Sequence, residues 1–298
     1  MIDVSIIIVN YNTAGMLRDC LESIKQQTSD VDYEVIVVDN DSSDDSVKML
    51  RKDFPEVILI ESGANIGFGR ANNLGMAHAK GEYLFLLNSD TILTNNAVRE
   101  FFLKAEFLRE NGRKIGVLGC ILRNRDMSTC HSYGRFITPR SELQEVTAKY
   151  LRFLKDQTNL RPEPVKGEKN VDYVTGADMF LPRQVFESTG GFDPDFFMYC
   201  EEVDWQKRME EAGLERLVVE GPEIIHLEGG SDSSKGSIWS PSRLRHLYES
   251  RRLYRRKHFS PGTLTAFRML HTLLDAPSII LTAIMLKRKE YLHLINLK

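Results

Sequence analysis

The sequence has few cysteines, no paired-cysteine motif and no stretch that resembles a secretory leader, and these features lead us to expect one cellular compartment. Its 298 residues include four widely separated cysteines, none in a CxxC pair. Zinc sites and disulfide frameworks need closely spaced or paired cysteines, so neither is indicated. A strand-like run begins at Val4 without the basic region, apolar stretch and cleavage site of a secretory signal. We therefore expect a protein of the reducing cytoplasm.

Two common nucleotide-binding motifs are also absent. Gly67-Phe68-Gly69 is followed by Asn72, where a GxGxxG dinucleotide fingerprint requires its third glycine. The phosphate-binding pattern GxxxxGK[ST] does not occur in the sequence. A nicotinamide cofactor and P-loop chemistry are therefore poorly supported.

Charge is distributed unevenly along a chain of ordinary globular composition, which is 42% hydrophobic and 27% charged. Residues 235–298 contain thirteen Lys and Arg but three acids, a net charge of +10, whereas the whole chain has −3. A basic tail on an acidic body favours attraction to a polyanion, either a nucleic acid or an anionic membrane surface. A solvated helical face is the alternative interpretation.

Strand-like runs alternate with helix-like segments over the first 120 residues. The runs lie at 4–9, 34–38, 57–60, 83–87 and 115–118. Between the first two runs, apolar residues recur at helical spacing: Leu17, Cys20, Leu21 and Ile24. This order predicts an α/β fold with a mostly parallel sheet and helices on both faces. Residues 121–170 are less periodic and rich in polar residues and proline, so we expect a variable excursion over the sheet.

Polar residues follow three of the predicted strands where each strand ends. They are Asn10-Tyr11-Asn12, the acidic loop 39–44 and Asn88-Ser89-Asp90. Each stretch alone could be a simple turn. In an open α/β sheet, however, these loops lie along one rim and converge on one crevice. An isolated carboxylate facing an acidic loop suits a divalent cation completed by substrate phosphates, so the ligand would be a nucleoside diphosphate derivative.

Six stretches in the same order resemble the family two glycosyltransferases, most closely a bacterial rhamnosyltransferase-like branch. They are VSIIIVNYN, VIVVDNDSSDDS, NIGFGRANNLG, LFLLNSD, the segment from VTGADMF to RMEEAG, and IIHLEGGS. The resemblance covers roughly residues 2–232. It implies a GT-A fold with a mostly parallel, Rossmann-like central sheet flanked by helices. It also implies a nucleotide-sugar donor and inversion at the anomeric carbon.

The resemblance assigns donor-binding roles to the first three loops. Asn10 and Tyr11 match the loop that packs on the donor base, and Asp39 matches the carboxylate that accepts a hydrogen bond from a uracil-like or thymine-like imide. Asp41 lies in the same acidic loop and is included in the donor site. Arg70 falls in the helix that approaches the diphosphate.

The resemblance also implies a divalent metal, Mg²⁺ or Mn²⁺. Asn88-Ser89-Asp90 occupies the position of the DxD motif, so Asp90 would hold the cation against the donor diphosphate. His226, in HLEGGS, matches a late motif that reaches the metal or the diphosphate. Asn88 departs from the motif, which leaves one fewer negative charge for the metal.

The second half of the chain carries the implied acceptor side. Gly176, Ala177 and Asp178 match the segment that lies against the donor sugar and the acceptor. The catalytic carboxylate of the family falls at Glu202, in an acidic cluster that begins a helix-like pattern, with Asp204 as a supporting group. The helix dipole also stabilises acids at the start of a helix, so the alternative to a catalytic role is that these acids simply cap the helix.

We expect residues 1–232 to form the glycosyltransferase domain, with 1–120 as its nucleotide-binding half and 171–232 as its acceptor and catalytic half. Residues 233–298 would be a basic, amphipathic helical extension. Its apolar run from Ala276 to Leu286 is too short to span a bilayer, so we expect an interfacial helix pair on anionic lipid at the inner face of the cell membrane. A helical lid or a homodimer contact is the alternative.

The resulting hypothesis is an inverting glycosyltransferase of cell-surface polysaccharide synthesis. It would use a UDP- or dTDP-sugar, with dTDP-rhamnose as one candidate, and a glycan or lipid-linked acceptor, and it would have no nucleic-acid partner. Two other classes share some of these features, namely a sugar-nucleotide pyrophosphorylase and a non-catalytic nucleotide-sugar-binding module. A pyrophosphorylase would need a basic, glycine-rich loop after the first strand, where the chain has NYNTAGM.

Overall fold

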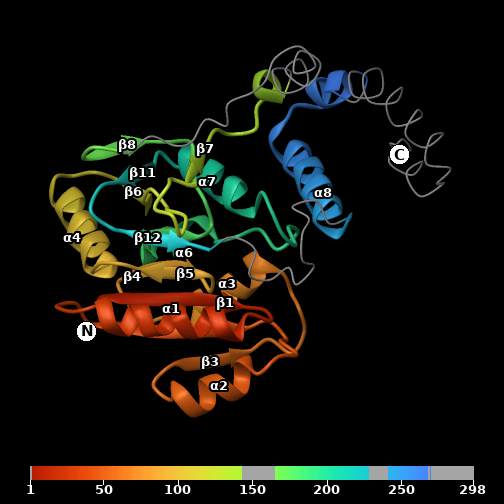
Figure 1. Cartoon of the computed structure of the whole chain (residues 1–298). Coiled ribbons are helices and arrows are strands. Elements are labelled where there is room, and N and C mark those ends of the chain that lie inside the picture. Colours follow the sequence, from red (N-terminus) through yellow and green to blue (C-terminus); the bar gives the residue numbers. More distant parts are fainter. Residues whose placement is uncertain (1, 143–164, 228–240, 268, 270–298) are drawn as a thin grey trace. The chain divides into compact units, whose positions relative to one another are not determined.

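A computed structural model describes residues 2–142, 165–227, 241–267 and 269 (Figure 1). Its strands are β1 (Val4–Asn10), β2 (Tyr33–Asp39), β3 (Ile58–Glu61), β4 (Tyr83–Asn88), β5 (Thr91–Leu93), β6 (Ile115–Gly119), β7 (Tyr133–Gly134), β8 (Glu168–Asn170), β9 (Tyr173–Val174), β10 (Asp178–Pro182), β11 (Glu215–Val219) and β12 (Ile224–His226). Its helices are α1 (Ala14–Gln27), α2 (Ser46–Asp53), α3 (Phe68–His78), α4 (Ala97–Glu110), α6 (Arg183–Thr189), α7 (Glu201–Glu211) and α8 (Pro241–His258).

The main sheet has the strand order β3-β2-β1-β4-β10-β6-β11-β8. Strand β1 pairs in parallel with β2 and β4, and β2 pairs in parallel with β3. Strands β10 and β8 run antiparallel to their neighbours. The predicted mostly parallel α/β sheet is therefore confirmed, and the five predicted strands correspond to β1, β2, β3, β4 and β6.

Helices cover both faces of this sheet, as predicted. Strand β4 explains how, because its side chains alternate between two core clusters: Phe85 and Leu87 enter one, and Leu84 and Leu86 enter the other. Residues of α1, α2 and α4 complete the first cluster, and residues of α3, α6 and α7 complete the second. The apolar stripe predicted for the first helix is buried throughout.

A small second sheet determines the position of the chain near residue 226. Strand β12 pairs antiparallel with β5, in a register that sets His226 opposite Thr91. The backbone N–H of Leu227 donates to the carbonyl of Asp90 over 2.9 Å. This pairing brings the late histidine to the end of β4.

The described residues fall into two compact units. Residues 2–136, 165–227 and 241–250 belong to one unit, and residues 137–142, 251–267 and 269 belong to the other. The predicted domain boundary at residue 232 lies outside the described residues, as does the apolar run 276–286. In the described part of the chain, every helix is too short or too polar to cross a membrane.

The predicted excursion at 121–170 is described only in part. Between 121 and 142 it contains the short strand β7, which pairs with β9, and the helical residues 139–142. Near the end of the excursion lies β8, at the sheet edge. Residues 143–164 lie outside the described part.

Helix α3 packs closely on the sheet at Gly75, and a substitution there tests this packing. A Cβ atom there would lie 2.5 Å from Ile7 Cγ2 and 3.1 Å from Val38 Cγ2, whereas one at Gly15 would meet no atom within 4 Å. We expect Gly75→Ala to lower the free energy of unfolding by about 1–3 kcal/mol through overpacking. The control Gly15→Ala should be neutral or stabilising by up to about 1 kcal/mol. Urea denaturation measures both, and equal stability of the two variants would contradict the close approach.

Candidate functional site

The loops after β1 and β2 are joined at a buried asparagine and a buried aspartate. Asn10 and Asp39 are register partners, and Asn10 Nδ2 donates to Asp39 Oδ1 over 2.9 Å. The other carboxylate oxygen of Asp39 accepts from the backbone N–H of Ser42 over 2.9 Å. Each oxygen of this carboxylate retains a further acceptor position, because an ionised carboxylate accepts about four hydrogen bonds. Asp39 is thus held in one orientation.

Further hydrogen bonds fasten these two loops to each other and to the loop after β4. Asn12, which has a φ of 56°, accepts from the backbone N–H of Ser43 over 2.7 Å. The hydroxyls of Thr13 and Ser89 lie 2.9 Å apart. Tyr11 is partly exposed and Asp41 is exposed beside these contacts. The structure therefore brings the three predicted strand-end loops together.

Asn40 is a site residue that the sequence reasoning did not single out. It is buried, its Oδ1 accepts from the backbone N–H of Ile66 over 2.9 Å, and its Nδ2 donates to Asn65 over 3.0 Å. It therefore holds the loop that leads into α3. Its position directly after the buried strand-end Asp39 was the available signal, because a buried amide must find partners.

Asp90 and His226 meet at the carboxyl end of β4. His226 Nε2 lies 3.2 Å from Asp90 Oδ1 and 3.4 Å from Asn88 Nδ2. The side chain of Asp90 is 13% exposed and that of His226 is 15% exposed. Burial alone would lower the pKa of His226, but the hydrogen bond to Asp90 and the neighbouring Cys130 raise that pKa to about 10. The two predicted metal-site residues are therefore adjacent and form an ion pair.

This donor set fits a divalent cation that is completed by a ligand. Among the described residues, no group of three or more His, Cys, Asp or Glu side chains could hold a metal ion. A cation would have to displace the proton that pairs His226 with Asp90. One carboxylate oxygen and one imidazole nitrogen would then leave most coordination positions for phosphate oxygens and water, and the imidazole suits Mn²⁺ better than Mg²⁺.

The segment 176–178 runs beside this cluster, but its aspartate side chain points into the core. The backbone N–H of Asn88 donates to the carbonyl of Ala177 over 3.1 Å. Asp178 is fully buried, with Oδ2 accepting from the backbone N–H of Cys120 over 2.7 Å and Oδ1 without a partner in the described part of the chain. Burial raises the pKa of Asp178 to about 7, although the Cys120 N–H and the charge of His226 oppose this rise.

The acids at the start of α7 face different neighbours. A Cβ built at Gly176 would lie 4.0 Å from the Cβ of Glu202, and one at Gly69 would lie 3.6 Å from that of Glu201. Glu202 is partly exposed, whereas Glu201 is 4% exposed. Burial raises the pKa of both carboxyls, and for Glu201 the charge of Glu202 adds to the rise. Glu202 is thus the acid that lies next to the 176–178 segment.

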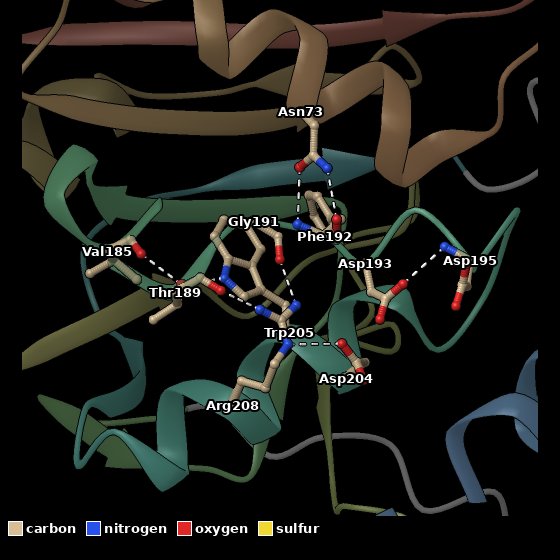
Figure 2. Close-up of polar contacts among 10 residues, drawn as sticks. All are labelled: Asn73, Val185, Thr189, Gly191, Phe192, Asp193, Asp195, Asp204, Trp205 and Arg208. Atoms are coloured by element: carbon tan, nitrogen blue, oxygen red, sulfur yellow. Dashed lines mark hydrogen bonds and ion pairs between the residues drawn. The ribbon is translucent and has the colours of Figure 1, made fainter. Parts of the chain in front are cut away.

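Asp204 lies instead in a structural network, drawn in Figure 2. It is 1% exposed and accepts from Arg208 Nε over 3.0 Å. The same guanidinium donates to the carbonyls of Thr189 and Gly191. Asp204 thereby stabilises the turn before α7.

The turn before α7 is also tied to α3. Asn73 makes two hydrogen bonds with the backbone of Phe192, accepting from its N–H over 2.9 Å and donating to its carbonyl over 2.7 Å (Figure 2). Arg70, one turn earlier on α3, is exposed and donates through Nε to the carbonyl of Pro194 over 2.7 Å. The predicted diphosphate-binding arginine therefore lies where α3 meets this turn.

Sequence comparisons identify similar proteins. A family model described as Glycosyl transferase family 2 matches residues 5–161. The chain is 26% identical over 264 residues to the rhamnosyltransferase WbbL of Escherichia coli (strain K12), covering 85% of this chain and 96% of that protein. It is 28% identical over 234 residues to the N-acetylglucosaminyl-diphospho-decaprenol L-rhamnosyltransferase of Mycobacterium tuberculosis (strain CDC 1551 / Oshkosh), covering 74% and 75%.

Solved structures with a similar fold are glycosyltransferases. GalNAc-T7 with UDP, GalNAc and Mn²⁺ has a TM-score of 0.55 at 17% identity, covering 77% of this chain and 45% of that chain. Residues 1–349 of TarS from S. aureus have a TM-score of 0.52 at 17% identity, covering 76% and 60%. The chain thus spans less than two thirds of either structure. The shared architecture is the GT-A fold, as the resemblance implied.

The buried carboxyl of Asp178 predicts a pH dependence of stability. Its pKa in the folded state, about 7, exceeds the ordinary value of 3.8 for an aspartate. The unfolded state therefore ionises first as pH rises, so Asp178 should destabilise the fold progressively between about pH 4 and pH 7, by up to about 4 kcal/mol. Asp178→Asn should flatten this loss, whereas Asp3→Asn at the surface should not. Urea denaturation across this range measures the difference, and parallel profiles for Asp178→Asn and wild type would refute the raised pKa.

Proposed function

Because the chain belongs to glycosyl transferase family 2, we propose that it transfers a sugar, with inversion, from a UDP- or dTDP-sugar to a hydroxyl of a glycan or lipid-linked saccharide. Two relatives are named rhamnosyltransferases, which makes dTDP-rhamnose the first donor to test. The name of the mycobacterial relative makes an N-acetylglucosaminyl-diphospho-polyprenol the first acceptor. Cell-surface polysaccharide synthesis is the process that such a reaction serves.

The observation that carries this proposal is the meeting of Asp90 and His226 beside the loop of Asp39. The hydrogen-bonded pair Thr13 and Ser89 joins the loop after β1 to the loop after β4. A nucleoside diphosphate could therefore place its base near Asp39 and its phosphates near Asp90. In this arrangement Asn10, Tyr11 and Asp41 would line the base and ribose side.

A divalent cation held by Asp90 and His226 would neutralise charge that develops on the departing diphosphate. Arg70 would add a positive charge on the α3 side, while its Nε donates to the carbonyl of Pro194. The backbone of Gly176 and Ala177 would lie against the donor sugar. Asp178 would support this segment from within the core, through its hydrogen bond to Cys120.

Glu202 would act as the general base. An acceptor hydroxyl is a weak nucleophile, so its proton must pass to a positioned carboxylate as it attacks the anomeric carbon. Attack from the face opposite the diphosphate inverts that carbon without a covalent enzyme intermediate. The raised pKa of Glu202 suits this role, because a base whose pKa approaches the working pH accepts a proton more readily. Asp204 would assist indirectly, by holding the turn that precedes α7.

A two-stage experiment tests the function. Thermal shift with UDP-, dTDP- and GDP-sugars in Mn²⁺ or Mg²⁺ should find one donor class that raises the melting temperature by mass action. That donor and the polyprenyl acceptor should then give a glycosylated product by mass spectrometry, and Asp90→Ala should give none. Pyrophosphate release from a nucleoside triphosphate would favour a pyrophosphorylase, and donor binding without turnover would favour a binding module.

Glu202→Gln separates base catalysis from donor binding. The amide retains the size of the side chain but cannot accept the proton, so transfer should fall about 10²-fold or more while the donor-induced thermal shift is retained. Asp204→Asn is the comparison, and this variant should differ from wild type mainly by a lower melting temperature. Normal transfer by Glu202→Gln together with inactive Glu201→Gln would move the base to Glu201.

Helix α8 adds a membrane-surface part to the proposal. Its second half is strongly basic, and Arg256 and Lys257 are exposed. Basic side chains attract anionic lipid headgroups over about one Debye length. Such docking would place the enzyme peripherally on the inner face of the cell membrane, where lipid-linked acceptors lie; a lid and a homodimer contact remain the competing roles.

Vesicle flotation tests this docking. The full chain should float with phosphatidylglycerol vesicles at low salt and dissociate at high salt, because surface charge attraction is screened. The double variant Arg256→Gln/Lys257→Gln should float several-fold less, and Arg51→Gln/Lys52→Gln, a matched pair at the end of α2, should float normally. Absence of flotation by wild type at low salt would remove the membrane part of the proposal.

A further inference from the structure

Helix α7, which carries Glu202, begins from an unfavourable backbone corner formed by Phe197–Cys200. Tyr199 has a φ of 70° and Cys200 a φ of 64°. Residues with a Cβ rarely adopt this left-handed region, and neither side chain belongs to the small polar type that tolerates it. Two such residues in succession persist only where the surroundings hold them. The contacts of this corner therefore decide where α7 begins.

One side of the corner is fixed by the start of α3. The backbone N–H of Phe68 donates to the carbonyl of Phe197 over 3.1 Å. Gly67 makes this approach possible, because a Cβ there would lie 2.3 Å from the same carbonyl oxygen.

The other side is held by the first half of α8. Ser250 Oγ donates to the carbonyl of Met198 over 2.7 Å, and Arg243 Nε donates to the hydroxyl of Tyr199 over 2.8 Å. The ring of His246 lies 4.9 Å from the ring of Phe197, centroid to centroid. Positions 243, 246 and 250 are three and four apart, so they lie on one face of the helix. One helix face thus contacts three consecutive residues of the corner.

We propose that Arg243 is a positioning residue for the general base, acting through Tyr199 with the support of Ser250. This inference rests on the proposed role of Glu202. When the contact of Arg243 with Tyr199 is lost, the corner relaxes and the first turn of α7 moves. Glu202 then shifts relative to the acceptor hydroxyl, and catalysis is sensitive to such displacements. The loops after β1, β2 and β4 do not depend on this contact, so donor binding is retained.

The kinetic test compares variants on both sides of one hydrogen bond. Arg243→Met and Tyr199→Phe should each lower kcat about tenfold with the donor KM within about twofold. The double variant should be no worse than Arg243→Met alone, because Arg243→Met already removes the interaction that Tyr199→Phe removes. Arg243→Lys, which retains a donor, should restore much of the activity. Arg51→Met, which removes an arginine from a surface ion pair with Glu61, should leave kcat unchanged.

Amide hydrogen exchange tests the same contact without using activity. Arg243→Met should speed exchange at residues 199–204 and leave the strands β1, β2 and β4 protected as in wild type. Unchanged exchange at 199–204, or kcat within twofold of wild type for both single variants, would overturn the proposal. So would parallel losses in kcat and donor affinity, which indicate general destabilisation. If wild type transfers no sugar from any donor, the proposed function fails and the exchange result alone decides whether Arg243 holds the corner.

Discussion

The parallel pairing of β1 with β2 and β4 is the constraint on which the candidate site depends. In this register Asn10 lies opposite Asp39, and Val9 lies opposite Asn88. Parallel strands end at the same edge, so the polar residues that follow them must share that edge. Because the strands are buried on both faces, a shift of one residue would move apolar side chains out of their core cluster. The same packing that stabilises the sheet therefore aligns the loops.

The polar groups at this edge are satisfied mainly by one another. Asn10 bonds Asp39, Asn12 bonds Ser43, and Asn40 bonds the loop that leads into α3. Buried amides and carboxylates are costly unless they are hydrogen-bonded, so such a network rigidifies the loops it joins. Asp178 and Glu201 are different, because burial raises the pKa of each carboxyl. When ionised, these acids lower the free energy of unfolding close to the site. Carboxyls with a raised pKa are common in functional regions.

The second half of the chain approaches this edge through contacts that are distant in sequence. Strand β12 pairs with β5 and carries His226 to Asp90. Asn73 on α3 and Arg208 on α7 hold the turn between α6 and α7, and α8 holds the corner from which α7 begins. Helix α7 is thus positioned by several contacts from different elements, which couples its placement to the packing of the unit.

Local sequence patterns were enough to predict five strands of the main sheet, the first helix and the three strand-end loops. Strand and helix periodicity are local properties: the apolar run from Tyr83 to Leu87 predicts a buried strand, and the spacing of Leu17 and Leu21 predicts a buried helix face. The sequence motifs also indicated the family and its GT-A fold, which the comparisons support. Three features became visible only in the folded chain: Asp204 pairs with Arg208, Asn40 holds the loop before α3, and Tyr199 and Cys200 form a left-handed corner. These features could not be predicted because each depends on a partner far away in the chain, and no local pattern specifies which distant group will satisfy a buried polar atom or hold a strained backbone.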